Sequence, residues 1–337
     1  MFSTTDVPTY VIDLGNAEAK RWAEVIAREK VVAGRLIEEA NAAFERVPEL
    51  LRWVFARLYQ AFGGLYRGEI ESWAQALGVS LGTATILNCA YELSHLRWPR
   101  LFGCTAGVRW VDGLGMVHVR NLDWPLATIG PATRLFRFRR GVREFVSVGV
   151  PGQVSVLSGM LPGAYAVTIN WAPPGPMPTF DFGPAFLLRN TLETCDSYAS
   201  AVEALRGTPL STSVFFTVCG TEPEQACVIE RTQRDAALRE MAGSALTQAN
   251  HHVAARFVGN NKVLREVEEQ GFHEDSGRRA EALGRALAEA GAVGALDEVG
   301  GILNVRPVFN CYTVQRMAFC PRTGDVRVWT GAGGKAE

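Results

Sequence analysis

The chain has 337 residues, of which 47% are hydrophobic and 20% are charged. This is the composition of an ordinary globular protein, so a collagen, a coiled coil and a disordered charged tail are excluded. Lysine and arginine together number 34, and aspartate and glutamate 35, which gives a formal net charge of -1 at pH 7. This near-equal number of basic and acidic residues argues against a nucleic-acid-binding protein, which would carry a basic excess.

Targeting and cysteine signals favour a cytoplasmic protein. The sequence has no uninterrupted apolar stretch long enough to cross a membrane, and its N-terminus lacks the basic start and apolar run of a secretory signal. The seven cysteines are an odd number and form no CxxC pair, so a zinc ribbon and a thioredoxin-type site are not indicated. We therefore expect a reducing, cytoplasmic location and cysteines that are mostly small core residues.

The first hundred residues are predicted to form one short strand and then helices. The strand covers 8–14, and from residue 16 to about residue 90 apolar side chains recur at three- and four-residue steps. Separate helices are predicted over 49–62, 69–77 and 81–94, the first of them rich in aromatic residues and ended by two glycines.

From Cys104 onwards the pattern changes to short strands separated by glycine- and proline-containing turns. Strands are predicted over 105–111, 116–122, 133–139, 143–150, 153–159, 164–170, 212–219, 226–232, 236–242, 244–250, 311–319 and 324–330. Helices are predicted over 184–191, 196–205 and 260–303. This order indicates an α+β fold of two stacked antiparallel sheets with helices outside.

The junction of these two parts, Gly103-Cys104, is a candidate cleavage site. A small residue before a cysteine lets the thiol approach the preceding carbonyl, as an N-to-S acyl shift requires. Hydrolysis of the shifted bond would make Cys104 a new N-terminus, and an α-amine, with an ordinary pKa of about 7.7–8.0, is a usable base at neutral pH. The alternative is that Cys104 is an ordinary buried thiol.

Arg120 and Asp123 follow Cys104 by 16 and 19 residues. The intervening residues read as a strand, a tight turn over 112–115 and a returning strand, so a hairpin would bring both side chains back towards Cys104. A carboxylate there can orient the α-amine, and a guanidinium can stabilise negative charge. The alternative is a cross-strand surface ion pair of little energetic consequence.

These residues carry a family resemblance. CTAGV followed by GMVHVRNLDWPL resembles the start of the mature chain in the choloylglycine hydrolase group of N-terminal nucleophile hydrolases, and within it the acid ceramidase-like amidases. TYVIDLGNAEAKRW and the Tyr91-Glu92 pair resemble segments upstream of the nucleophile in the same group. The resemblance implies that Cys104, Arg120 and Asp123 belong to the active site.

Two asparagines follow from the same resemblance. GAYAVTINWAP implies that Asn170 lies in the oxyanion hole, and LTQANHHV implies that Asn250 is a second active-site amide. Alternatively, Asn170 only ends a strand and Asn250 only begins a loop. The family also has an arginine about a dozen residues after the second asparagine. Here that position falls near Lys262, between Arg256 and Arg265, and the choice among them is left open.

No metal and no cofactor are expected. Only five histidines are present, and His251-His252 lack the spacing of a metal site. The segment between Tyr91-Glu92 and Cys104 is several residues longer than in the amidases, so it could reshape the cleavage loop or cover the pocket.

The resemblance implies a four-layer αββα sandwich, with a helical prelude over 1–103 and a catalytic domain over 104–337. It implies self-cleavage before Cys104 and hydrolysis of an N-acyl amide through a thioester, with the cleaved prelude retained as a partner. A lipophilic acyl chain on a small amine is expected. The aromatic face of the helix over 49–62 either packs as core against the sheets or, if part of it is exposed, contacts a membrane surface. The oligomeric state is left open.

Three alternatives remain at this level. The first is an acyltransferase of the same fold, and the second is a hydrolase of penicillin or bile-acid amides. The third is a catalytically silent module that binds a lipid or a protein partner and does not cleave itself.

Overall fold

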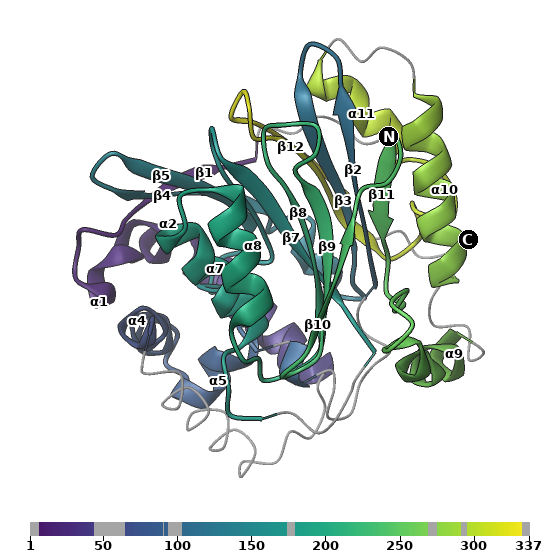
Figure 1. Cartoon of the computed structure of the whole chain (residues 1–337). Coiled ribbons are helices and arrows are strands. Elements are labelled where there is room, and N and C mark those ends of the chain that lie inside the picture. Colours follow the sequence, from purple (N-terminus) through teal and green to yellow (C-terminus); the bar gives the residue numbers. More distant parts are fainter. Residues whose placement is uncertain are drawn as a thin grey trace.

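A computed structural model of the chain describes residues 7–43, 65–89, 91–93, 103–173, 179–268, 275–290 and 295–331. Two β-sheets lie face to face, and helices cover the outer face of each (Figure 1). The predicted αββα sandwich is therefore confirmed. The predicted helix over 49–62 and most of the segment before Cys104 lie outside the described residues.

The larger sheet has eight strands in the order β1-β4-β5-β6-β7-β8-β9-β10. Neighbouring strands are antiparallel except that β1 pairs with β4 in parallel, which brings the prelude's strand into the catalytic part's sheet. The strands are β1 (Thr9–Asp13), β4 (Arg134–Arg140), β5 (Arg143–Gly149), β6 (Ser158–Leu161), β7 (Tyr165–Trp171), β8 (Val214–Cys219), β9 (Ala226–Arg231) and β10 (Ala236–Glu240).

The smaller sheet is antiparallel and has five strands in the order β11-β2-β3-β12-β13. The predicted turn over 112–115 joins β2 to β3, where Gly113 and Gly115 adopt φ of 84° and 102°. The strands are β11 (Ala245–Gln248), β2 (Gly103–Val111), β3 (Gly115–Asp123), β12 (Thr313–Cys320) and β13 (Asp325–Thr330). Because β2 begins at Gly103, the junction is paired in the ladder.

Helices of the catalytic part form the two outer layers. On the eight-stranded sheet lie α7 (Pro184–Thr194) and α8 (Tyr198–Gly207), and on the five-stranded sheet lie α10 (Ser276–Glu289) and α11 (Val299–Ile302) (Figure 1). The Ser197 side chain caps α8, and the Asp275 carboxylate caps α10 by accepting from the backbone N–H groups of Gly277 and Arg278. Shorter elements complete this part: α9 (Lys262–Glu268), η2 (Ala127–Ile129), η3 (Val258–Asn261) and η4 (Leu296–Glu298).

The prelude helices pack beside the eight-stranded sheet through buried ion pairs. They are α1 (Glu18–Arg21), α2 (Ala23–Ala43), α4 (Arg67–Leu77) and α5 (Leu81–Ile86). Glu69 of α4 accepts two hydrogen bonds from Arg189 of α7, at 2.6 and 2.7 Å, and both side chains are fully buried. Glu29 of α2 accepts two from Arg134 of β4, at 2.7 and 2.9 Å. Two bidentate pairs therefore join the prelude to the catalytic part.

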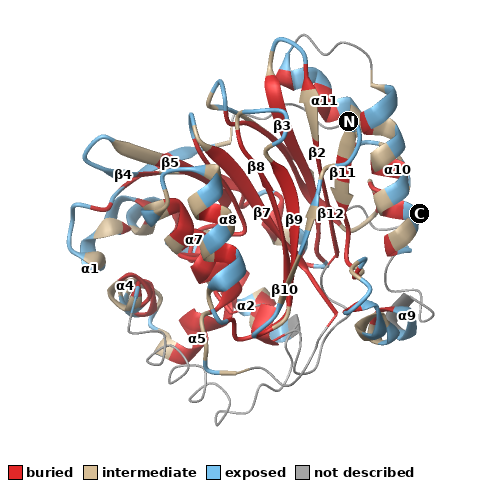
Figure 2. Cartoon of the chain, in the orientation of Figure 1, coloured by how far each residue is buried: buried red, intermediate tan, exposed pale blue. Residues whose placement is uncertain are grey.

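Most strand residues are buried, as the red ribbons of Figure 2 show, and apolar side chains fill the space between the sheets. On the outer face of β2, Gly107 lets α10 come close. A Cβ at this glycine would lie 2.6 Å from Leu287 Cδ1 and 3.0 Å from Leu283 Cδ2. This close approach brings the first turn of α10 to the start of β2.

Three predicted elements differ from the structure. The helix predicted over 81–94 is interrupted, because α5 covers only Leu81–Ile86 and residues 87–89 are not helical. The strand predicted over 153–159 is wrong, because β6 begins only at Ser158. The Asn88 side-chain oxygen accepts from the backbone N–H groups of Val154 and Ser155, at 2.7 and 3.0 Å, so the prelude occupies donors that a strand would use. The single helical stretch predicted over 260–303 is divided in the described residues into η3, α9, α10, η4 and α11.

Candidate active site

Cys104 is the second residue of β2 and is fully buried. Its backbone N–H donates to Asn250 Oδ1 at 3.0 Å, and its carbonyl oxygen accepts from Arg279 Nη1 at 2.8 Å. Its Sγ lies 3.3 Å from Arg120 Nη2. Both peptide groups and the thiol of one residue are thus held by polar side chains, which an ordinary core cysteine does not require.

Arg120 reaches the thiol because the hairpin register places it on the inner face, opposite Ala106 and next to Cys104. Besides the thiol, this fully buried guanidinium donates to the carbonyl oxygen of Leu157 at 2.9 Å, the Ser158 hydroxyl and the carbonyl oxygen of Ile169. These three acceptors are neutral. The positive charge therefore remains available to stabilise negative charge that develops at the sulfur.

Asp123 lies directly opposite Gly103 in the β2–β3 ladder, on the other face of the sheet from the Cys104 side chain. Thr313 Oγ1 donates to its Oδ1 at 2.6 Å, Asn310 Nδ2 donates to its Oδ2 at 3.0 Å, and Arg279 Nη1 lies 3.9 Å away. Burial raises the pKa of Asp123 above its ordinary value, and these three neighbours offset part of that rise. Asp123 is thus paired with the junction through the backbone, and its carboxylate is held by Thr313, Asn310 and Arg279.

Asn250 follows β11, and its amide orientation is fixed by its partners. Oδ1 accepts from two donors, the Cys104 N–H and Arg279 Nη2, at 3.0 and 2.8 Å. Nδ2 donates to the carbonyl oxygen of Trp171 at 2.8 Å. The amide oxygen of Asn250, and not its Nδ2, therefore faces the Cys104 nitrogen, which would become the α-amine after cleavage.

Arg279 is a buried site residue that the sequence analysis did not identify. It projects from the first turn of α10 and joins the Cys104 carbonyl oxygen, Thr105 Oγ1 and Asn250 Oδ1, each at 2.8 Å. Of the basic residues left open near Lys262, Arg256 pairs with Asp235 at 3.2 Å, and the choice between Lys262 and Arg265 stays a prediction. A signal was present: residues 276, 279, 283 and 287 are spaced as one helix face, and all are buried.

Asn170, near the end of β7, ties the two sheets together at this end. Its Nδ2 donates to the carbonyl oxygens of Gln248 and Ala249, at 2.9 and 3.1 Å, just before Asn250. Among the described residues, no hydrogen-bond partner reaches its buried Oδ1. Its expected role as an oxyanion donor stays a prediction, since both amide hydrogens are directed at carbonyls here.

The prelude contributes Tyr91 and Glu92 to the same end of the molecule. The Tyr91 hydroxyl donates to the carbonyl oxygen of Ile169 at 3.1 Å, the acceptor that Arg120 also uses. Burial, and next the Cys104 thiol, raise the pKa of Tyr91 well above its ordinary range. Glu92 accepts from the Ser211 hydroxyl at 3.0 Å, and burial raises its pKa to about 7. The prelude therefore shares a hydrogen-bond acceptor, the Ile169 carbonyl, with Arg120.

No protein-family model matches the chain. An N-acylethanolamine-hydrolyzing acid amidase of Caenorhabditis elegans is 24% identical over 245 residues, covering 68% of each chain. The rabbit (Oryctolagus cuniculus) protein of that name is 26% identical over 336 residues, 93% of this chain and 86% of its own. Rat (Rattus norvegicus) acid ceramidase is 26% identical over 271 residues, 68% of this chain and 64% of its own.

The chain is thus similar in sequence to acid amidases and acid ceramidases. The solved structure of a Caenorhabditis elegans N-acylethanolamine-hydrolyzing acid amidase ortholog matches it with a TM-score of 0.54 at 21% identity, over 68% of this chain and 100% of that one. That match supports the αββα fold. The predicted family resemblance and the predicted class, an amide-hydrolysing enzyme, are confirmed by these relatives.

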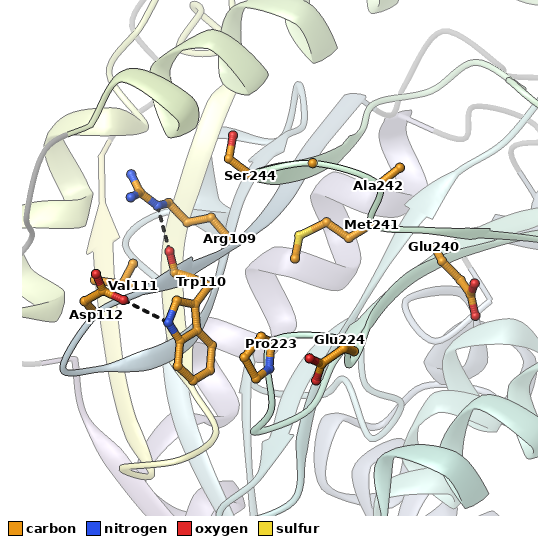
Figure 3. Close-up of a pocket in the computed structure, with 11 residues that line it drawn as sticks. Arg109, Trp110, Val111, Asp112, Pro223, Glu224, Glu240, Met241, Ala242 and Ser244 are labelled. Carbon is orange, nitrogen blue, oxygen red and sulfur yellow. Dashed lines mark hydrogen bonds between the residues drawn. The ribbon is translucent and has the colours of Figure 1, made fainter.

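Unlike the buried amidase-like site, the groove drawn in Figure 3 is open to solvent and lies at the far end of β2. It has a volume of about 840 Å³. Trp110 and Asp112 at the end of β2, Glu224 after β8, and Met241 after β10 are among its walls (Figure 3). Cys104 is the second residue of β2 and the groove lies at the other end of this strand, so the roughly 3.3 Å rise per residue separates them by almost the length of the strand.

Among the residues that the structure describes, no group of three or more histidine, cysteine, aspartate or glutamate side chains could hold a metal ion. His252 Nδ1 instead lies 3.3 Å from Glu230 Oε2, and Glu230 also accepts from the backbone N–H groups of Val253 and Ala254. This contact anchors the loop that follows Asn250. No helix in the described ranges is long and apolar enough to span a bilayer.

Proposed function

We propose that the chain is a self-cleaving cysteine amidohydrolase that acts on an N-acyl amide through a thioester at Cys104. One observation carries the proposal: the Cys104 backbone N–H donates to Asn250 Oδ1 at 3.0 Å while its Sγ lies 3.3 Å from Arg120. At Cys104, a hydrogen-bond acceptor for an α-amine (Asn250 Oδ1) thus lies close to a cation that can stabilise a thiolate (Arg120). An N-terminal cysteine needs both.

In the proposed self-cleavage, Cys104 Sγ forms a bond to the Gly103 carbonyl carbon. The Gly103-Cys104 peptide bond breaks, and the thiol proton passes to the departing nitrogen. Water then hydrolyses the thioester, which leaves a Gly103 carboxylate and restores the thiol. The pairing of Gly103 with Asp123 supports this step, because the ladder holds the scissile residue rigidly beside a carboxylate.

In the proposed catalytic cycle, the Cys104 sulfur attacks the substrate carbonyl carbon, and Arg120 stabilises its negative charge. The protonated α-amine gives its proton to the leaving amine as the carbon–nitrogen bond breaks. The same amine then takes a proton from water, whose oxygen bonds to the thioester carbon. The carbon–sulfur bond breaks, which releases the free acid and restores the Cys104 thiolate. Asn250 Oδ1 and Asp123 orient the amine. Asn170 would donate to the oxyanion after its Nδ2 turns from the Gln248 and Ala249 carbonyls.

Arg279 would hold these parts in register. Its guanidinium joins the Cys104 carbonyl oxygen, Asn250 Oδ1 and the neighbourhood of Asp123. Because it bonds to the carbonyl of Cys104 and not to the nitrogen, the scission would leave these contacts in place. The prelude would stay bound as a second chain through the Glu69–Arg189 and Glu29–Arg134 pairs.

The proposed substrate carries a lipophilic acyl chain on a small polar amine. The names of the relatives support this class, since one group is called N-acylethanolamine-hydrolyzing and the other acid ceramidase. Each CH₂ buried in an apolar pocket contributes about 0.8 kcal/mol, so kcat/KM should rise about fourfold per CH₂ until the pocket is full.

The test is a series of N-acyl amides of increasing chain length on one fluorogenic amine, assayed with wild type and Cys104→Ala. The expected result is a rising profile that only wild type shows, with the acyl group recovered as the free acid. A flat profile, or a preference for phenoxyacetyl or steroid acyl groups, would refute the lipid substrate. Preferential transfer of the acyl group to added hydroxylamine or amine would identify an acyltransferase instead.

A further inference from the structure

A turn close to the C-terminal end of the described chain holds both oxygens of Asp123. Thr313 Oγ1 donates to Oδ1 at 2.6 Å, and Asn310 Nδ2 donates to Oδ2 at 3.0 Å. The three side chains belong to residues that are 8% exposed or less. Each carboxylate oxygen therefore has its own side-chain donor, supplied from almost 190 residues away in the sequence.

The hydrogen bonds inside this turn fix the direction of both donors. The Asn310 N–H donates to Thr313 Oγ1 at 3.1 Å, so the hydroxyl hydrogen is left for Asp123. The Tyr312 N–H donates to Asn310 Oδ1 at 2.9 Å, so the amide must present its Nδ2 to the carboxylate. Neither side chain can reverse without breaking a bond within the turn.

The sheet fixes the position of the turn. Thr313 is paired with Asp123 at the start of β12, and the register shifts between Thr313 and Gln315. The Trp124 N–H also donates to the Tyr312 carbonyl oxygen at 2.9 Å. The turn is thus attached to the strand end that carries Asp123, and Asp123 in turn lies opposite Gly103.

We infer that Asn310 and Thr313 are positioning residues for the reaction proposed above: together they keep the Asp123 carboxylate ionised and directed at the Gly103-Cys104 junction. The inference rests on that proposed function. Among the described residues, Arg279 of α10 lies 3.9 Å from Asp123, and Arg120 acts on it electrostatically from the other face of β3. Both are cations, so they act in the same direction as the two donors.

The pKa of Asp123 supports this assignment. Burial raises it, and Arg279, Thr313 and Asn310 each lower it. Loss of the Thr313 hydroxyl should therefore raise it further. Because the ionised carboxylate is the form that orients the amine, the acidic limb of the pH profile should move to higher pH.

The experiment compares Thr313→Val, Thr313→Ser and wild type in the kcat/KM-against-pH profile for an N-acyl amide, after intact mass has shown each to be processed. Thr313→Val should lower kcat/KM at neutral pH about 10- to 100-fold and move the acidic limb up by about one pH unit, the size of one lost bond to a charged group. Thr313→Ser keeps the hydroxyl and should restore both.

Thr133→Val is the matched control. Thr133 is also buried, and its hydroxyl accepts from Gln315 Nε2 of the same strand, β12, at 2.8 Å. This variant should lose stability without moving the acidic limb. If Thr313→Val yields no folded protein, Asn310→Asp replaces it. That change keeps the side-chain shape, puts a second carboxylate against Asp123 and should move the limb in the same direction.

The inference is wrong if wild type hydrolyses the amide and the pH profile of Thr313→Val superimposes on that of wild type. It is also wrong if Thr313→Ser does not restore the rate that Thr313→Val loses. If wild type shows no amide hydrolysis, or hydrolysis that persists in Cys104→Ala, the proposed function is wrong, and this inference fails with it.

Discussion

The two ends of the β2–β3 hairpin differ in the solvent exposure of their charged side chains. Where β2 starts, Arg120, Asp123, Asn250 and Arg279 are each at most 2% exposed and surround Cys104. At the other end, Asp112, Glu224 and Glu240 are exposed on the walls of the groove in Figure 3. One end has buried polar groups with specific partners, and the other has solvated charges on an open groove.

This contrast teaches where function should be sought in the fold. Taking a charge out of water costs several kcal/mol unless partners compensate, whereas solvated charges on a groove cost almost nothing. A buried network in which most polar groups have specific partners therefore indicates a selected arrangement more strongly than volume does. The predictions below test this ranking of the two ends.

The largest effect is expected from Cys104→Ala. Without the sulfur neither the acyl shift nor the thioester can form, so the protein should remain one chain and show no hydrolysis. Intact mass and an N-acyl amide assay measure both. Cys219→Ala is the matched control, because Cys219 is equally buried but lies on β8. Scission at the same bond in Cys104→Ala would rule out the self-cleavage mechanism.

The next largest effect is expected from Arg279→Met, which keeps much of the side-chain length and removes the charge. It removes the Arg279 donor to the Cys104 carbonyl oxygen, one of the two donors to Asn250 Oδ1 and a cation near Asp123. We expect kcat/KM to fall at least about a hundredfold. Arg278→Met, one residue earlier with 77% of its side chain exposed, should stay near wild type. An equal loss of kcat/KM in the two variants would show that Arg279 is not a residue of the site.

A smaller effect, on stability, is expected at Glu92. Burial raises its pKa from 4.5 to about 7, so the folded state retains a proton that the unfolded state releases over this window. Stability should therefore fall as pH rises from about 4.5 to about 7, by at most about 3 kcal/mol. Urea unfolding at several pH values should show a weaker fall in Glu92→Gln than in wild type. The exposed Glu222→Gln should leave the fall unchanged.

The smallest effect is expected in the groove. Glu224→Gln and Glu240→Gln, separately or together, should change kcat/KM by less than about twofold, because both side chains are solvated at the end of the hairpin remote from Cys104. Steady-state kinetics on the same amide measure this. A tenfold loss would erase the contrast between the two ends and bring the groove into the reaction.

The sequence predicted the part of the site that local geometry determines. The hairpin follows from two apolar strands and a glycine turn, and its register alone brings Arg120 back to Cys104. Arg279 and Asn310 could not be found in this way, since Arg279 lies 29 residues from Asn250 and Asn310 lies 187 residues from Asp123. For Arg279 the helix periodicity was an available signal. For Asn310 only the folded turn reveals the contact.

The larger sheet shows the same limit. Its strands were largely predicted, but the parallel pairing of β1 with β4 joins residues more than a hundred positions apart. The error over 153–159 has a related cause, because Asn88 from the prelude takes the backbone donors of Val154 and Ser155. Propensity describes neighbours in sequence, and these contacts come from distant ones.

The Glu69–Arg189 and Glu29–Arg134 pairs connect residues on opposite sides of the Gly103-Cys104 bond. In the uncut chain their encounter during folding is intramolecular, at an effective concentration set by the connecting polypeptide. In the proposed two-chain form the same encounter becomes bimolecular. Refolding of the mature protein from denaturant should thus slow with dilution, whereas refolding of the uncut Cys104→Ala chain should not. The native structure would therefore depend on the order of events, with folding of the single chain before its cleavage.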